Sequence, residues 1–222
     1  MRKLLFHYDI VSPYSYFAFH VVRRHQSSWR AHGVDVDFKA CFLGGLLKST
    51  GNQSPISLPA RAPYMMADFV RCGRYYDVPL QLPDGWPTNT LPAMRALAAM
   101  ERDGLAGLDD VIAHLFDAHW GRGRWPADLD ALTTLLTEAG VEQAADYLAQ
   151  AQTPEVKTLL KAATEACAAY GAFGLPALVL LDDDGADPAL YFGADRLPML
   201  AFDATLPWHG PRSTSAPAAT AE

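Results

Sequence analysis

The first residues that could do chemistry are Ser12-Pro13-Tyr14-Ser15, which follow an expected strand over residues 3–9 and open an expected helix. Serine is a preferred helix N-cap and proline a preferred first helical residue. A helix N-terminus offers free N–H groups and the positive end of the helix dipole, which stabilise an anion. Ser12 cannot perform thiol–disulfide exchange, but it can donate a hydrogen bond to a sulfur atom that a ligand brings. Taken alone, the motif fits an ordinary helix cap better than a reactive site.

The interactions available at such a site are strong enough to lower the pKa of a bound thiol. A free thiol has a pKa of about 8.5, and lowering it by two units requires roughly 2.7 kcal/mol. A charge-assisted hydrogen bond contributes roughly 1.5–3 kcal/mol, and an exposed helix end adds up to about 1 kcal/mol. A hydroxyl at a helix N-terminus can therefore hold a bound thiol as its thiolate.

Two other segments could hold parts of a peptide-like ligand. Pro176 ends the stretch over residues 171–176 and begins an expected strand, so it is a candidate cis proline that presents the backbone N–H and C=O of Leu175 to a ligand. At the start of the last expected helix, the backbone of Ala194 could bind a carboxylate and Asp195 could accept from an ammonium group. A plain turn with a trans proline and simple capping by Asp195 are the structural alternatives.

Other reactive residue types carry weaker signals. His114 and His119 lack the four-residue step of a metal pair, and the acidic run over residues 182–184 is typical of a solvated turn. We therefore expect no metal site. The three cysteines form no Cys-x-x-Cys pair and no zinc spacing, and they read as reduced, inert thiols; they are Cys41, Cys72 and Cys167. Four apolar or aromatic residues could line an apolar pocket for a second substrate, and ordinary helix packing explains their presence equally well. They are Tyr64, Met65, Met66 and Phe69.

The elements that must position these residues form a split α/β unit. Residues 3–9 and 34–40 predict strands around a helix over about 14–29, which favours a parallel pair. Residues 42–63 predict an extended loop, and residues 62–150 predict four or five helices with short connections. A helix over 154–170, strands over 176–181 and 189–192, and a last helix near 196–202 follow. Neither half has enough strands alone, so the two halves must pair.

Bulk properties exclude several classes of protein. The chain has 222 residues and a net charge of −7, which argues against a nucleic-acid partner. The N-terminal apolar run is too short for a signal peptide, and no stretch approaches the length of a membrane span. We therefore expect a cytoplasmic protein without a membrane partner. Residues 207–222 are rich in Pro, Ser, Thr and Ala and predict a flexible tail.

Four segments together resemble the kappa class of glutathione transferases. The related bacterial 2-hydroxychromene-2-carboxylate isomerases share the first, third and last of them. The resemblance spans residues 1 to about 203, and its order and spacing are more specific than any single motif. The segments are FHYDIVSPYSY at 6–16, GLLKSTGN at 45–52, YGAFGLP at 170–176 and FGADR at 192–196.

The resemblance implies an α/β fold of the thioredoxin-like type with an inserted all-helical domain, as in DsbA-like disulfide oxidoreductases. Those proteins carry Cys-x-x-Cys where this chain has Ser12 and Ser15. Residues 1–45 and 165–206 are expected to form the discontinuous thioredoxin-like domain, and residues 46–164 the helical insertion.

The resemblance also implies a glutathione site. Ser12 matches the serine that holds the glutathione sulfur, and Asn52 matches an asparagine near it. Arg61 stands where the transferases carry a lysine near the glycyl carboxylate. Leu175, with Pro176 after it, matches the backbone that pairs with the cysteinyl unit. Asp195 matches the aspartate at the γ-glutamyl end, whereas Ala194 departs from the serine that is usual there and keeps only its backbone N–H.

Three functions follow as hypotheses. The first is a kappa-like transferase in which bound glutathione attacks a small hydrophobic electrophile. The second is a 2-hydroxychromene-2-carboxylate isomerase, which would use glutathione as a catalytic cofactor on an aromatic carboxylate. The third is a non-catalytic peptide-binding module. A dithiol oxidoreductase is disfavoured because Ser12 and Ser15 replace both cysteines, and the resemblance implies a homodimer.

Overall fold

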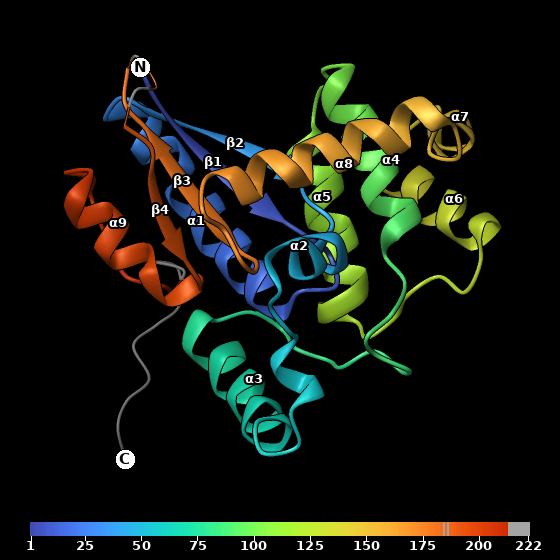
Figure 1. Ribbon diagram of the computed structural model, residues 1–222, viewed down its shortest axis with the longest axis horizontal. Helices are drawn as coiled ribbons and strands as arrows, with labels where there is room; N and C mark the ends of the chain where they lie inside the picture. Colours follow the sequence, from blue (N-terminus) through green and yellow to red (C-terminus); the bar gives the residue numbers. More distant parts are fainter. Residues whose placement is uncertain (184, 186, 213–222) are drawn as a thin grey trace.

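The protein is described here by a computed structural model that covers residues 1–183, 185 and 187–212. Its centre is a four-stranded sheet in the order β2-β1-β3-β4, made by β1 (Arg2–Tyr8), β2 (Val34–Ala40), β3 (Ala177–Leu181) and β4 (Ala189–Phe192) (Figure 1). β1 is parallel to β2 and antiparallel to β3, which confirms that the two ends of the chain pair in one sheet.

The helices confirm most of the expected pattern. They are α1 (Pro13–Ala31), α2 (Leu43–Thr50), α3 (Ala62–Tyr76), α4 (Leu91–Arg102), α5 (Leu108–Phe116), α6 (Leu129–Glu138), α7 (Ala144–Gln150), α8 (Pro154–Ala169) and α9 (Leu197–Asp203). Short turns complete them: 3-10 turns at Pro55–Ser57 and Ala194–Arg196, and a π-helical turn at Asp117–Gly121 that continues α5. The fold is therefore the expected α/β arrangement, with helices α2–α7 placed between β2 and α8.

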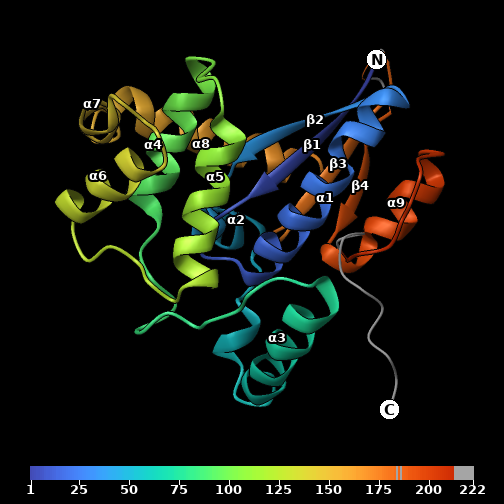
Figure 2. The same ribbon diagram turned by 180° about the vertical axis from the view of Figure 1, so that it is seen from behind.

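α1 and α8 cover opposite faces of the sheet, as the two opposed views show (Figures 1 and 2). Successive side chains of a strand point to opposite faces. On β1, Phe6 meets Phe19 of α1 with ring centroids 6.4 Å apart. The next residue, His7, meets Tyr170 at the end of α8 at 6.3 Å. This alternation sets two separate apolar layers, one on each side of the sheet.

The larger layer is continuous from the sheet through α1 into helices α4–α7. A smaller cluster lies on the other face and consists of Cys41, Leu46, Cys167, Ala172, Leu175 and Ala177. The boundary between a thioredoxin-like domain and a helical domain stays a prediction.

The expected loop over residues 42–63 is wrong in its first part, where α2 forms. No local side chain caps this helix. The cap comes from Asp9, whose Oδ2 accepts the backbone N–H of Leu43 at 2.9 Å. A cap supplied by a residue 34 positions away leaves no local pattern for sequence analysis to use.

The C-terminal segment packs on α1 as far as it is described. Trp29 Nε1 donates to the backbone oxygen of Pro207 at 3.0 Å. The ring of Trp208 stacks on His25 at 4.7 Å, and the N–H of His209 donates to His25 Nε2 at 3.3 Å. The rest of the predicted tail, residues 213–222, lies outside the described residues, as do Asp184 and Ala186 in the β3–β4 turn.

Candidate active site

Ser12 caps α1 as predicted, and its hydroxyl also reaches across the sheet edge. Its oxygen accepts the backbone N–H of Ser15 at 3.1 Å, which satisfies one of the free donors of the first helical turn. Its proton is donated to the backbone oxygen of Leu175 at 3.1 Å. The side chain is 4% exposed. A buried hydroxyl that accepts from a helix N-terminus is a strengthened donor.

The Leu175 segment forms the facing wall. The Leu175–Pro176 peptide bond is cis, and the backbone oxygen of Pro176 accepts the N–H of Gly193 at 3.1 Å. Asn52, just past the end of α2, donates from Nδ2 to the backbone oxygen of Phe173 at 2.7 Å. Two segments far apart in sequence are therefore tied together next to Ser12.

Asp195 lies on the third side of the site, in the turn between β4 and α9. Its carboxylate pairs with Arg196 at 3.0 Å and is 66% exposed. Gly193 has φ +100°, and a Cβ placed there would lie 2.6 Å from Asp195 Oδ1. Glycine is required at this position by both its backbone conformation and the close approach of the carboxylate.

A cavity of about 570 Å³ opens between the start of α1 at Ser12, the Leu175 segment, the turn at Asp195 and α3. Of the predicted site residues, its walls hold Ser12, Asn52, Leu175, Ala194 and Asp195. Pro176 is buried and Arg61 is exposed at the start of α3, and neither lines the cavity. Tyr64 and Met65 line it, whereas Met66 and Phe69 do not. Phe69 instead packs edge-on against Trp86 in the interior, with ring centroids 5.8 Å apart.

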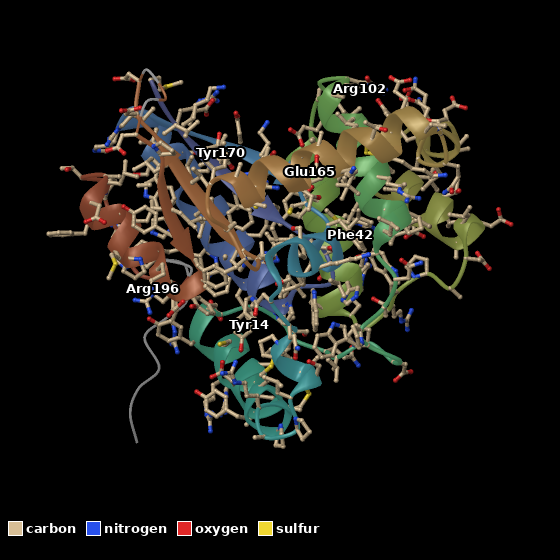
Figure 3. All side chains as sticks on the ribbon, in the orientation of Figure 1. Tyr14, Phe42, Arg102, Glu165, Tyr170 and Arg196 are labelled. Carbon is tan, nitrogen blue, oxygen red and sulfur yellow. The ribbon has the colours of Figure 1, made fainter. Side chains whose placement is uncertain are left out.

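Sequence reasoning missed a hydrogen-bonded group on the α3 wall. Asp68 Oδ2 accepts from the Tyr14 hydroxyl at 3.1 Å and from the Cys72 thiol at 3.7 Å. Tyr14 lies between the start of α1 and α3 (Figure 3). Burial, followed by the charge of Asp68, raises the pKa of Tyr14 and raises that of Cys72 to about 12, so both groups keep their protons. Within the described residues, the charged side chains of the cavity are Asp68 and Asp195, both acidic.

Asp9 was also missed, and it organises the elements behind the site. Its carboxylate is fully buried, and it accepts from the N–H groups of Val11 and Leu43 and from the Thr90 hydroxyl, at 3.1, 2.9 and 2.7 Å. These bonds tie the turn before Ser12 to the starts of α2 and α4. Burial raises the pKa of Asp9 although these three donors lower it. The only sequence signal was an aspartate at the end of an apolar strand.

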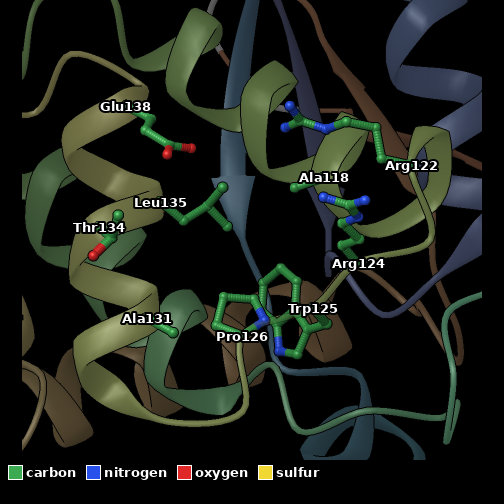
Figure 4. Close-up of a pocket in the computed structure, with 9 residues that line it drawn as sticks. All are labelled: Ala118, Arg122, Arg124, Trp125, Pro126, Ala131, Thr134, Leu135 and Glu138. Atoms are coloured by element: carbon green, nitrogen blue, oxygen red, sulfur yellow. The ribbon is translucent and has the colours of Figure 1, made fainter.

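The other candidate residues lie elsewhere. His119 is fully buried, with Nε2 2.6 Å from Thr88 Oγ1, and His114 lies 3.9 Å from Glu138. A second cavity, between the turn after α5 and α6, holds Arg122, Arg124 and Trp125 but none of the predicted site residues (Figure 4). No cluster of three potential metal-ligating side chains occurs within residues 1–183, 185 and 187–212. In the same part of the chain, no helix is long and apolar enough to cross a bilayer.

Comparisons with known proteins place this geometry in a family. Residues 3–203 match the model of the DSBA-like thioredoxin domain. The chain is 31% identical to glutathione S-transferase kappa 1 of Homo sapiens, over 95% of this chain and 94% of the relative. It is 28% identical to 2-hydroxychromene-2-carboxylate isomerase of Pseudomonas sp. (strain C18), over 88% of this chain and 86% of the relative.

A solved structure of a 2-hydroxychromene-2-carboxylate isomerase shares the fold with a TM-score of 0.75 at 23% identity, over 91% of this chain and 94% of that one. These matches confirm the resemblance expected from the four sequence segments, and they cover almost the whole chain. The chain belongs to the DsbA-like thioredoxin family, in the branch of enzymes that contains the kappa glutathione transferases and the 2-hydroxychromene-2-carboxylate isomerases.

Proposed function

We propose that this protein is a glutathione-dependent enzyme of the kappa-transferase type, in which Ser12 stabilises the thiolate of bound glutathione for attack on an electrophile. The observation that carries the proposal is the position of the Ser12 hydroxyl. It is buried at the N-terminus of α1, opens on the cavity and lies 3.1 Å from the backbone of Leu175. The same hydroxyl thus contacts both the N-terminus of α1 and the backbone that would pair with a peptide ligand.

Glutathione fits the cavity as a peptide with a thiol between two charged ends. The backbone of Leu175, before Pro176, would pair with the cysteinyl unit and bring its sulfur to Ser12. Asp195 would accept the γ-glutamyl ammonium, and the Ala194 N–H would donate to the γ-glutamyl carboxylate. Asn52 already spans the two walls through Phe173. Arg61 would have to turn inward from the surface to meet the glycyl carboxylate.

The chemistry at Ser12 is an exchange of hydrogen bonds. In the free protein its proton points to the Leu175 oxygen, while the Ser15 N–H holds the serine oxygen. An incoming sulfur would take over the serine proton. Donation to a thiolate is stronger than donation to a neutral carbonyl oxygen, so the exchange favours the ionised sulfur. The same thiolate would then be positioned against a second substrate, which reduces the entropic cost of reaction.

The identity of the second substrate distinguishes the transferase hypothesis from the isomerase hypothesis. The remaining walls of the cavity are largely apolar and include Leu43, Met65 and Trp86, as a small hydrophobic electrophile requires. An aromatic carboxylate remains the alternative, with glutathione acting as a catalytic cofactor. A homodimer is proposed on the family resemblance.

Two assays test the proposal. Conjugation of glutathione to 1-chloro-2,4-dinitrobenzene reports transferase activity, and conversion of a 2-hydroxychromene-2-carboxylate reports isomerase activity. We expect Ser12→Ala to lower kcat on the preferred substrate by roughly 10²-fold with a small change in the glutathione KM.

Ser15→Ala is the matched control. Ser15 is fully buried and its hydroxyl has no partner in the described structure, so this variant should keep most of the activity. Full activity in Ser12→Ala would refute the role of Ser12. Tight glutathione binding without turnover of either substrate would favour the peptide-binding module.

A further inference from the structure

The small apolar cluster behind the glutathione cavity contains two thiols. Cys41 directly follows β2, and Cys167 lies in the last turn of α8. Both side chains are 0% exposed. Their neighbours in the cluster include Leu46 of α2 and Leu175, whose backbone forms the peptide edge beside Ser12. The two thiols are thus packed directly against the cavity wall.

The two cysteines lie in the same buried cluster, where each thiol perturbs the ionisation of the other. The backbone N–H of Cys41 donates to the Tyr8 oxygen at 2.9 Å, which fixes it to the end of β1. The next N–H, that of Phe42, donates to Thr164 Oγ1 at 3.0 Å. Thr164 precedes Cys167 by three residues and therefore lies on the same face of α8.

His7 completes the group. It is 4% exposed, and within the described residues neither of its ring nitrogens has a hydrogen-bond partner. The Cys41 thiol and His7 lower the pKa of Cys167, whereas Cys167 and burial raise the pKa of Cys41. Cys167 is therefore the more readily ionised of the two thiols, and oxidation by a peroxide requires thiolate character.

We propose that Cys41 and Cys167 are an oxidation site that closes to a disulfide when a small peroxide reaches it. In the first step the Cys167 sulfur attacks one oxygen of hydrogen peroxide, the O–O bond breaks, and a sulfenic acid and water form. His7 takes the thiol proton and passes it to the leaving hydroxide. In the second step the Cys41 sulfur attacks the sulfenic sulfur, and a second water leaves. Two thiols and one peroxide give one disulfide and two waters.

The disulfide would act on the site in front of it. Cys41 leads into α2, which ends beside Asn52, and Cys167 leads into the segment that carries Leu175. A disulfide replaces the packing of two free thiols by a covalent bond of defined geometry, so it would couple the end of β2 to the end of α8 beneath the cavity. We expect the oxidised protein to bind glutathione roughly five-fold more weakly. This second expectation, unlike the disulfide itself, rests on the proposed function.

The test uses the full chain treated with hydrogen peroxide and mapped by non-reducing peptide mass spectrometry. We expect a cross-linked peptide pair containing Cys41 and Cys167, with the loss of two hydrogens, and its reversal by dithiothreitol. Cys72→Ser is the matched control and should still form the cross-link. Cys41→Ser and Cys167→Ser should not, and His7→Phe should slow its formation.

A peroxide-treated protein that shows oxidation at Cys72 alone, or sulfinic acid at Cys167 without a cross-link, would overturn the proposal. Glutathione affinity is then measured by calorimetry on the reduced and cross-linked forms. An unchanged affinity would remove the coupling to the cavity. A reduced protein that binds no glutathione yet forms the cross-link would refute the proposed function and leave the oxidation site standing.

Discussion

Ser12 has one proton to donate, and at rest that proton serves Leu175. The side chain is therefore satisfied before a ligand arrives, and so is the Ser15 N–H that it accepts. Under the proposed function, binding of a thiol would replace one acceptor by another and leave no buried donor without a partner, which avoids the desolvation penalty of an orphaned hydroxyl. Ser12 could then receive a sulfur and still keep its hydrogen bonds when no ligand is bound.

Asp195 gives a prediction that separates binding from chemistry. Asp195→Asn should raise the glutathione KM about tenfold, since a hydrogen bond between charged groups contributes roughly 1.5–3 kcal/mol. It should leave kcat nearly unchanged, because the ammonium lies far from the sulfur. The measurement is steady-state kinetics with glutathione and with an analogue whose γ-glutamyl amine is replaced by hydrogen.

The analogue is the control, because it has no ammonium to lose and should respond little to the variant. Equal losses with both ligands would place Asp195 outside the ammonium site. Arg196→Gln tests the neighbouring ion pair, and it should tighten or preserve binding because it frees the carboxylate.

For single residues, the sequence predicted those cavity residues that belong to a recognisable motif. Ser12 and Asp195 each lie at the end of a helix or strand that the pattern could locate, whereas Asn52 was named through the family resemblance; the cavity brings the three together. Asp68 could not be found in this way, because its meaning comes from contact with Tyr14 on another helix, 54 residues away. Arg61 was named from the family resemblance, and its exposed position away from the cavity depends on tertiary packing that the sequence pattern does not contain.

Among the elements, α2 depends most on a distant residue. Its first N–H donates to Asp9, and Asp9 also holds the start of α4 through Thr90. Glycines 44 and 45 in its first turn give it little intrinsic helix propensity. For this reason the sequence predicted a loop, whereas α1 and α8, which carry their own caps at Ser12 and Thr153, were predicted well.

Removing the shared cap should loosen this element. Asp9→Ala should lower the free energy of unfolding by roughly 2–4 kcal/mol, because several buried donors lose their acceptor. Thr90→Val removes one of these bonds and should cost only about 1 kcal/mol. Urea unfolding followed by circular dichroism measures both. Equal stability of Asp9→Ala and the wild type would contradict the role given to Asp9.

Gly193 offers a prediction for the turn between β4 and α9. Gly193→Ala places a methyl group where the Asp195 carboxylate now lies and forces a left-handed conformation on alanine. We expect the glutathione KM to rise with little change in kcat. Gly185→Ala, with φ +71° and open space around its Cβ, is the matched control for backbone strain without displacement of Asp195. Similar kinetics for the two variants would rule out the steric argument.

For the molecule as a whole, the half-buried His20 and the buried His119 contribute to the response to acid. Burial, aided by Arg24 and Arg23, lowers the pKa of His20 from 6.5 to about 4. Burial also lowers that of His119 to about 3. The folded state binds fewer protons than the unfolded state below pH 6.5, so stability is full above that pH and is lost as the pH falls towards 4.

His20→Phe tests this whole-molecule effect. The ring of His20 lies edge-on to Tyr16 and Phe19, so phenylalanine should fit in its place. The wild type should lose a few kcal/mol between about pH 7 and pH 4.5, at about 1.36 kcal/mol for each pKa unit, and the variant should lose visibly less. His32→Gln, at an exposed position, is the control. The same pH slope in wild type and His20→Phe would contradict the assignment.

The measurement that tests the central claim most directly is the thiol pKa of bound glutathione, read from the ultraviolet absorbance of the thiolate against pH. The wild-type complex should ionise well below the free value of about 8.5, and Ser12→Ala should return the pKa towards that value while glutathione still binds. A bound thiol that titrates at its free value in both proteins would contradict the proposal that Ser12 activates the sulfur.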